Sequence, residues 1–403
     1  MTNARGPAGP TLSVIIPVRD EVRRLPTVLA GVAAQSLRPD EVIVVDGDST
    51  DGTREWLAGH GDGVVVLRNE RRIIPAALNL GIAAASGELV ARMDAHADYP
   101  PDYLATLAGV LAARPDVTGA GAAMTTAGRG PWGEAIASVL SRRIGLGGAR
   151  HRVGHRGGPV EHVFTGCYRR SALVAAGGYD ERLSANEDYE MDHRLRAAGG
   201  LLWLSRDART TWYVREGPLR TARQMFRYGS AKALTLRLHP GSLRARQAAP
   251  PALICGLAGL AAASRRIGPY PFAAAAAAYL GTCAVAAVRA ARADGASPWR
   301  AALVPPLVHL SWGAGVLTGL VRHAHPRPAL SPLRPADTTE PAHPGDAARP
   351  ARTGVAANGP GGRPGHATRG ERAAPAPTGD EAGGAGGRPE RVTRDEWAGT
   401  GEA

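Results

Sequence analysis

Short apolar runs with strand character alternate with helical patterns between residues 11 and 117, and this alternation restricts the possible folds more than any other feature. Four runs are expected to be strands, at residues 12–17, 41–45, 64–67 and 88–93, with helices between them at residues 24–35, 51–59 and 74–85. Parallel strands need crossover connections of this kind, which are usually helical. The sequence therefore predicts an α/β fold around a mostly parallel sheet.

Charged residues follow each of these expected strands. In open parallel sheets, ligands bind beyond the carboxyl ends of the strands, where such side chains meet. The expected ligand-binding edge is made by Arg19, Glu21, Asp46, Asp48, Arg71, Arg72, Asp94 and His96.

The positive charge of the chain is confined to its first 323 residues. The formal net charge is +12, whereas residues 324–403 hold ten Arg and ten Asp or Glu and are neutral. A basic body fits nucleic acid, anionic lipid or a phosphorylated ligand. Aromatic residues make up only 5% of the chain and no nucleic-acid motif is present, so we expect no nucleic-acid partner. The three cysteines lack metal-ligand or redox spacing, which excludes a disulfide framework and fits a reducing compartment.

Three apolar segments occupy residues 248–264, 268–288 and 301–321. Each approaches the length of about 20 residues that crosses a bilayer, so we expect two or three transmembrane helices within residues 248–322. A buried Ala-rich bundle is the alternative, and the first segment is short enough to be re-entrant. The positive-inside rule places the arginines before the first segment and after the second in the cytoplasm, together with the α/β domain. Arg265 and Arg266 would then lie outside, which counts against three crossings.

Composition divides the rest of the 403-residue chain. Residues 1–10 are expected to be a flexible leader without the apolar region of a signal peptide, and residues 11–217 the α/β domain. Residues 145–159 are predicted to form a mobile basic loop. Residues 218–247 are expected to be a basic juxtamembrane segment, and residues 323–403 a disordered Pro/Gly-rich tail.

Three motifs hold residues that could perform chemistry. Asp46 ends a strand before Ser49 or Thr50, either of which could cap the next helix, so an ordinary turn is the alternative. Asp94 and His96 alternate at another strand end, which suits one Mn²⁺ ion and, less well, Mg²⁺.

The third motif is the acidic cluster at residues 186–190, which opens a helix expected at residues 188–198. Acidic residues are favourable at any helix start, so a purely structural role is the alternative.

Together these motifs resemble those of the family 2 glycosyltransferases, which have the GT-A fold. The resemblance covers residues 11–230 and includes Ser13–Glu21, Val45–Thr53, Asn79, Gly81, Ser86–Glu88, Asp94–His96, Gly166, Gly177–Asp180, Asn186–Asp188 and Arg194. The sequence Arg-Met-Asp-Ala-His, the Arg71–Arg72 pair and the three apolar segments look most like the succinoglycan-type enzymes of exopolysaccharide assembly.

The resemblance implies a role for each matching residue. On the donor side, Asp46 would accept from the uracil of a UDP-sugar, and Arg72, rather than Arg71, would contact the diphosphate. Asp94 would face the ribose or a divalent metal, Mn²⁺ or Mg²⁺, which His96 would also bind. Asp188 would be the base that deprotonates the acceptor hydroxyl. The remaining implied residues are Pro17, Arg19 and Glu21 in the nucleoside pocket, and Gly166 and Glu187 beside the donor and acceptor sugars.

The sequence departs from the family pattern at three places. The usual Asp-x-Asp metal motif ends here in His96, which leaves the choice of metal open. The usual Asp-Asp-Gly turn is Asp46–Gly47–Asp48, so Asp48 could be a spare carboxylate. Processive synthases have Gln-x-x-Arg-Trp where this chain has Gln224, Arg227 and Tyr228, so we expect a single addition.

The resemblance therefore implies a membrane-anchored, multi-pass inverting glycosyltransferase whose catalytic domain is cytoplasmic. Its donor would be a UDP-sugar, with UDP-glucose the first choice, and its acceptor a polyprenyl-diphosphate-linked saccharide or a polysaccharide of the cell envelope. The basic segment would face anionic lipid or the acceptor diphosphate, or merely flank the membrane. A catalytically inactive membrane-anchored scaffold is the main alternative. An NAD enzyme is disfavoured because the first strand lacks G-x-G-x-x-G.

Overall fold

The computed structural model describes residues 9–61, 63–147 and 157–324. All of them belong to the first of two units in the chain, residues 1–341. Most of the expected leader, most of the basic loop at residues 145–159 and nearly all of the expected tail lie outside the described residues.

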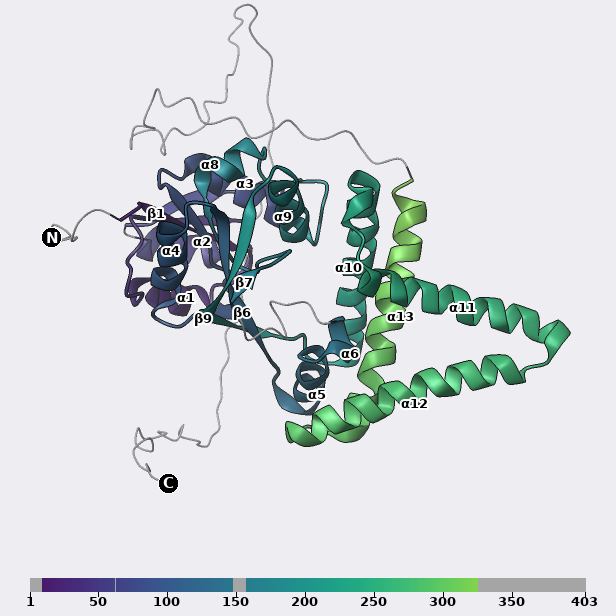
Figure 1. Ribbon diagram of the computed structural model, residues 1–403. Coiled ribbons are helices and arrows are strands. Elements are labelled where there is room, and N and C mark those ends of the chain that lie inside the picture. Colours follow the sequence, from purple (N-terminus) through teal and green to yellow (C-terminus); the bar gives the residue numbers. More distant parts are fainter. Residues whose placement is uncertain (1–8, 62, 148–156, 325–403) are drawn as a thin grey trace, which may run out of the picture. The chain divides into compact units, whose positions relative to one another are not determined.

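A nine-stranded sheet lies at the centre of the α/β domain, with strand order β3-β2-β1-β4-β8-β6-β9-β5 and β7 paired to β9. The first four strands are parallel and close to the predicted positions, with helices α1, α2 and α3 between them (Figure 1). Their bounds are β1 Leu12–Val18, α1 Leu25–Ala33, β2 Glu41–Asp46, α2 Thr53–His60, β3 Val65–Arg68, α3 Ile74–Ala84 and β4 Leu89–Arg92.

The second half of the sheet is mixed, which refines the expectation of a mostly parallel sheet. Strand β8 runs antiparallel to both β4 and β6, whereas β6 and β9 are parallel. A three-residue strand such as β8 has no readable periodicity, so the sequence pattern did not indicate it. The bounds are β5 Ala97–Asp98, α4 Tyr103–Ala113, β6 Val117–Ala127, α5 Gly130–Leu140, α6 Arg143–Leu146, β7 Gly158–Pro159, β8 Cys167–Arg169, α8 Arg170–Ala175, α9 Glu187–Ala197 and β9 Leu201–Tyr213.

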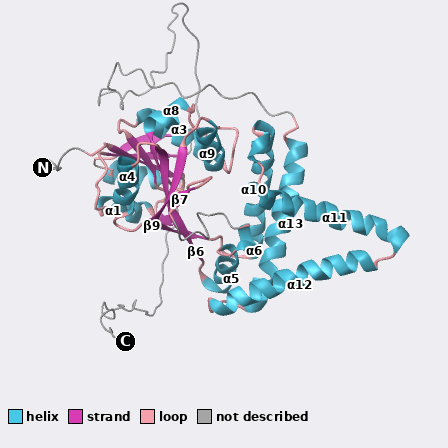
Figure 2. Cartoon of the chain, viewed as in Figure 1, coloured by secondary structure: helices cyan, strands magenta, loops and turns pink. Residues whose placement is uncertain are grey.

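Alternation along β1 divides the core into two layers. Val14 and Ile16 pack in one cluster with residues of α1 and α4, whereas Ile15 packs in the other with residues of α3 and α9. Successive side chains of a strand point to opposite faces, so each face of the sheet buries its own helical layer. The helices in Figure 2 accordingly cover both sides of the magenta sheet. This arrangement leaves the carboxyl ends of the parallel strands open for a ligand.

Five helical elements follow the sheet: α10 Pro218–Leu238, the short η1 Pro240–Ser242, α11 Ala245–Ile267, α12 Tyr270–Ala293 and α13 Pro298–Arg322. By length and composition, α11, α12 and α13 are each able to cross a membrane, as the apolar segments predicted.

The basic segment is largely helix α10, which packs along α13 (Figure 1). A Cβ atom on Gly229 would lie 2.1 Å from the Trp312 carbonyl, and one on Gly315 would lie 2.1 Å from the Phe226 carbonyl. Small residues let two helices approach this closely. One face of α10 is therefore covered by protein and is unavailable to lipid.

The α/β domain is also joined to the apolar helices by polar contacts. Asp294, after α12, accepts hydrogen bonds from Ser138 Oγ and from Arg142 Nη2, each at 2.7 Å. On α13, His309 Nε2 lies 2.8 Å from the carbonyl oxygen of Ile144. These contacts hold α5 and α6 against α12 and α13.

Candidate active site

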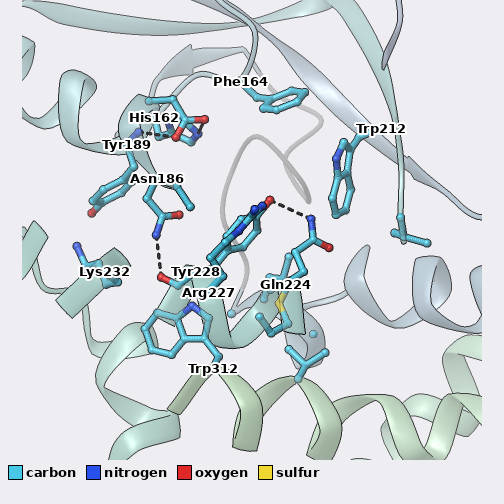
Figure 3. Close-up of a pocket in the computed structure, with 18 of the residues that line it drawn as sticks. His162, Phe164, Asn186, Tyr189, Trp212, Gln224, Arg227, Tyr228, Lys232 and Trp312 are labelled. Carbon is cyan, nitrogen blue, oxygen red and sulfur yellow. Dashed lines mark hydrogen bonds and ion pairs between the residues drawn. The ribbon is translucent and has the colours of Figure 1, made fainter. Parts of the chain in front are cut away.

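A cavity of about 1310 Å³ is lined by residues of both the α/β domain and the following helices (Figure 3). Four of the predicted site residues line it: Asp94, His96, Glu187 and Asp188. The first two follow β4, and the other two begin α9. The fold thus brings together two motifs that lie about 90 positions apart in the sequence.

A buried arginine connects these two motifs. Arg92 Nε donates to Asp94 Oδ1 at 2.7 Å and Nη2 donates to Oδ2 at 3.1 Å, while Nη1 donates to Glu187 Oε1 at 3.2 Å. All three residues are at most 7% exposed. Burial by itself would lower the pKa of the Arg92 guanidinium. The negative charges of Asp94 and Glu187 have the larger effect, so the pKa is raised. Burial, followed by the charge of Asp188, raises the pKa of Glu187. Arg92 was not predicted as a site residue, although its place two residues before Asp94 offered a signal.

Asp188 faces a histidine that is itself fixed by a second carboxylate. His162 Nε2 lies 3.7 Å from Asp188 Oδ2, and His162 Nδ1 lies 2.7 Å from Asp192 Oδ2. Asp192 is fully buried and also accepts from the Val163 amide and the Tyr168 hydroxyl, each at 2.9 Å. Its position is therefore well determined, and it sets the orientation of the imidazole toward Asp188. This contact could not be predicted from the sequence, because His162 stands alone in a loop.

The other residues expected to bind the donor lie at the ends of β1, β2 and β3, outside the lining of the large cavity. This group, here named the donor edge, consists of Pro17, Arg19, Glu21, Asp46, Asp48 and Arg72. Asp46 is 2% exposed and accepts from Arg54, with Nη2 at 3.3 Å from Oδ2. The carboxylate of Asp48 meets three arginines, because Arg54 and Arg68 donate to it at 2.6 and 3.1 Å and Arg72 also forms an ion pair with it.

Asp48 is therefore no spare carboxylate. Hydrogen bonds from Arg54 and then Arg72 hold the pKa of Asp48 well below its usual range. An arginine cluster of this kind can transfer its hydrogen bonds to a diphosphate, because carboxylate and phosphate oxygens accept in similar geometry.

The expected cap of helix α2 is wrong. The helix begins at Thr53 after Gly52, and the Thr53 amide donates to Asp51 Oδ1 at 3.0 Å rather than to Ser49 or Thr50. Ser49 Oγ instead accepts from the Asp20 amide at 2.8 Å, and Thr53 Oγ1 accepts from the Glu21 amide at 3.0 Å. These bonds join the loop after β1 to the loop after β2, so the hydroxyl groups position Arg19 and Glu21 rather than a helix end.

Strained backbone conformations occur in the loops that hold the predicted site residues. Five non-glycine residues have positive φ angles among the described residues, and each lies in a loop of the predicted site: Asp20, Asp48, Arg72, Thr165 and Asn186. Such conformations are costly and cluster at functional sites, where the surrounding structure maintains them.

Several residues that match the family motifs make contacts within the protein and do not line the cavity. Asn79 Nδ2 donates to the Tyr179 carbonyl and its Oδ1 accepts from the Tyr179 amide, at 2.9 and 2.7 Å. Arg71 pairs with Glu181, whereas Arg72 pairs with Asp48 in the arginine cluster described above. A Cβ on Gly166 would lie 2.7 Å from Val163 Cγ2, so this glycine is needed for packing and does not line the cavity.

The residues of the expected metal motif fit a partial metal site. Among the described residues, no cluster of three or more His, Cys, Asp or Glu side chains could hold an ion. Asp94 and His96 nevertheless line the same cavity, and Arg92 fixes the Asp94 carboxylate. A carboxylate and an imidazole suffice for Mn²⁺ or Mg²⁺ when diphosphate oxygens and water complete the coordination.

The Gln224, Arg227 and Tyr228 motif lies on α10 and also lines the cavity. Gln224 Nε2 donates to Tyr228 Oη at 3.0 Å, and Asn186 Nδ2 donates to the Tyr228 carbonyl at 2.8 Å (Figure 3). The second bond ties α10 to the residue that precedes Glu187. The motif is therefore part of the cavity wall and not merely a helix face beside the membrane.

Comparison with known proteins identifies the family of the chain. The glycosyl transferase family 2 model matches residues 13–175. The succinoglycan biosynthesis protein ExoA of Rhizobium meliloti is 34% identical over 251 residues, which cover 59% of this chain and 73% of that protein. The chain therefore belongs to glycosyl transferase family 2 and is a glycosyltransferase. The resemblance to the succinoglycan-type enzymes is confirmed as well.

Two more distant likenesses complete the comparison. A Methanococcus voltae protein named dolichyl N-acetyl-alpha-D-glucosaminyl phosphate 3-beta-D-2,3-diacetamido-2,3-dideoxy-beta-D-glucuronosyltransferase is 24% identical, with 56% of this chain and 74% of that protein covered. A mannosyltransferase of Pyrobaculum calidifontis, solved with GDP-Man and Mn²⁺, has a TM-score of 0.47 and 21% identity, with 78% of this chain and 88% of that chain covered.

Proposed function

We propose that this glycosyltransferase moves a sugar from a UDP-sugar, with UDP-glucose the first choice, to a polyprenyl-diphosphate-linked saccharide or a polysaccharide at the cytoplasmic face of a membrane. One observation supports this reaction best. Asp94 and His96, expected beside the donor, and Asp188, expected as the base, line a single cavity. With the sugar end of the donor beside Asp94 and the acceptor beside Asp188, the two reactants would meet in this cavity and gain rate from positioning.

The proposed transfer is one in-line displacement. The acceptor hydroxyl oxygen attacks C1 as the bond from C1 to the diphosphate oxygen breaks, so a UDP-α-sugar yields a β-linkage. Asp188 accepts the hydroxyl proton, and UDP leaves with the bonding electrons. Arg72 neutralises charge that develops on the diphosphate. A divalent metal bound by Asp94 and His96 would supply further neutralisation there.

A covalent intermediate is not required by this geometry. Cys167 lies inside the sheet, where burial raises the pKa of its thiol to about 12. It therefore offers no thiolate to the donor at neutral pH.

A membrane-bound acceptor is supported by three features. Helices α11, α12 and α13 are candidate membrane spans, and α11 has no buried residue. The cavity wall includes residues of α11, α12 and α13. The name of the Methanococcus voltae relative describes a dolichyl-linked sugar phosphate as its acceptor. We place the α/β domain in the cytoplasm because the arginines at residues 237–246, around the start of α11, and at residues 289–300, around the end of α12 and the start of α13, follow the positive-inside rule.

The donor and metal assignments are tested by thermal stability in detergent. UDP with Mn²⁺, at 100 times its dissociation constant, should stabilise the protein by about 2.7 kcal/mol, whereas GDP, dTDP and NAD should not. His96→Ala should weaken the dependence on Mn²⁺ without abolishing UDP binding. An unchanged metal titration would make His96 a structural residue. Absence of any response to UDP in the wild-type protein would favour an inactive scaffold.

His162 is expected to position the base. His162→Gln should lower kcat roughly 10- to 100-fold at unchanged donor KM, because Asp188 loses the neighbour that orients it. Steady-state kinetics with varied donor would measure both constants. His60→Gln is the matched control, since His60 is exposed on α2. Equal kcat in wild type and His162→Gln would remove His162 from the catalytic arrangement.

A further inference from the structure

The chain contains a single lysine, and that lysine is buried in the wall of the cavity. Of 48 basic residues, only Lys232 is not an arginine. It lies on α10, is 2% exposed, and is among the residues that line the cavity (Figure 3). A buried ammonium is costly, so its position beside a large cavity needs an explanation.

The ammonium of Lys232 donates its hydrogen bonds to neutral oxygen atoms and not to a carboxylate. Its Nζ donates to the carbonyl and to the hydroxyl oxygen of Ser242, both at 3.0 Å. The ammonium lies 4.3 Å from the ring centroid of Tyr189, the residue after Asp188. The Tyr189 hydroxyl donates to the same Ser242 carbonyl at 3.1 Å. Lys232 is thus fixed directly behind the start of α9, where the proposed base lies.

The charges around Lys232 leave a positive excess. Arg244 and Arg246, at the start of α11, both pair with Glu161 at 3.0 Å. Two guanidinium groups therefore share one carboxylate, with the ammonium beside them. Burial, followed by the charges of Arg244 and Arg246, lowers the pKa of Lys232 to about 7. Such a group gains charge and stability when an anion binds next to it.

The cavity wall beyond Lys232 becomes apolar. It continues onto α11 and α13, where the apolar lining residues Ala249, Pro250, Leu253, Val308 and Trp312 outnumber the polar Gln247 and His309. Both helices are candidate membrane spans. The cavity is therefore bordered by the proposed base, by a positive group and by an apolar wall. These three features match the sugar, the phosphate and the hydrocarbon chain of an amphiphile, respectively.

We propose that Lys232 and Arg246 form a binding site for the phosphate of a lipid-linked acceptor, on the membrane side of Asp188. This site deepens the proposed function and rests on it for the identity of the ligand as acceptor. The site is distinct from the donor edge, where Asp46, Asp48 and Arg72 lie outside the cavity lining. A lysine suits a phosphate because its ammonium is a compact charge with three donors.

Direct binding tests the site without relying on transfer. The probe is geranylgeranyl diphosphate, added to detergent-solubilised full chain in which saturating UDP and Mn²⁺ already fill the donor edge. Lys232→Met should weaken binding about 10- to 100-fold, since a hydrogen-bonded charge pair is lost. Lys232→Arg should keep most of the affinity. Arg223→Met is the matched control on α10, because Arg223 is exposed and does not line the cavity, and it should bind like wild type.

The pH dependence gives a second readout. Wild-type affinity should fall as pH rises through about 7, because the free ammonium loses its proton there, whereas Lys232→Arg should lack this component. The other charged or titratable groups around Lys232 are Tyr189, His193, Glu161, Arg244 and Arg246, and they are the same in both proteins.

Three results would overturn the proposal. Equal affinity of wild type and Lys232→Met would do so, as would equal weakening by Arg223→Met. Displacement of the probe by phosphatidylglycerol at similar concentration would show a general headgroup site instead. Failure of the proposed function would give another result than failure of the phosphate site. UDP would not stabilise the protein, whereas the prenyl diphosphate would still bind.

Discussion

Asp188→Asn is expected to abolish sugar transfer while UDP binding persists. The asparagine has nearly the same shape but cannot accept the acceptor proton, and a general base contributes about 10²- to 10⁴-fold in rate. The contacts of the backbone stay intact, since the Tyr189 amide can still donate to the remaining side-chain oxygen. Initial rates with UDP-sugar and a lipid-linked acceptor would measure the loss, and thermal stabilisation by UDP with Mn²⁺ would confirm donor binding.

The matched control is Glu55→Gln, which changes an exposed acid in the first turn of α2. It should leave transfer unchanged. Substantial residual transfer by Asp188→Asn would move the role of base to another carboxylate, with Glu187 the nearest candidate in sequence. Loss of UDP stabilisation in the same variant would instead indicate that the substitution disturbs the donor edge.

Arg92→Met is expected to cause the largest loss of stability among these variants. The guanidinium is buried between Asp94 and Glu187. The substitution leaves both carboxylates buried without their positively charged partner. Removal of one partner from a buried ion pair costs about 3–5 kcal/mol, because the remaining charge is neither hydrated nor paired. In a domain of this size that corresponds to a fall in melting temperature of roughly 10 °C. Thermal unfolding in detergent would measure it.

Two further variants make the result specific. Arg206→Met removes an arginine whose side chain is 73% exposed, so it should leave the melting temperature unchanged. Arg92→Lys keeps the charge but loses the two-pronged bond to Asp94, so it should fall between wild type and Arg92→Met. A melting temperature equal to wild type in Arg92→Met would show that Asp94 and Glu187 do not depend on this arginine.

Much of the donor edge could be predicted from the sequence because the relevant signals are local. The apolar run from Leu12 identified a buried strand, and the end of that run placed Arg19 and Glu21 at an edge. The same reasoning located Asp46 and Asp94. Such positions follow from strand geometry and from the rule that ligands bind at carboxyl ends, and neither requires knowledge of distant contacts.

Long-range pairing could not be predicted in the same way. Arg92 meets Glu187 across 95 positions, and Asp192 fixes His162 from another element. The role of Asp48 stayed open in the sequence because three arginines converge on it only after β2 and β3 pair. Each of these contacts depends on the path of the chain, which local periodicity does not encode.

The sequence by itself determined the α/β class, the order of the motifs, the three apolar helices and the family, because periodicity, length and motif spacing are properties of short segments. Only the tertiary structure decided that the second half of the sheet is mixed, that α10 packs on α13 rather than lying free, and that Lys232 borders the cavity. The physical reason is that burial and pairing arise when distant segments exclude water together, and a charge becomes functional or costly only in that shared environment.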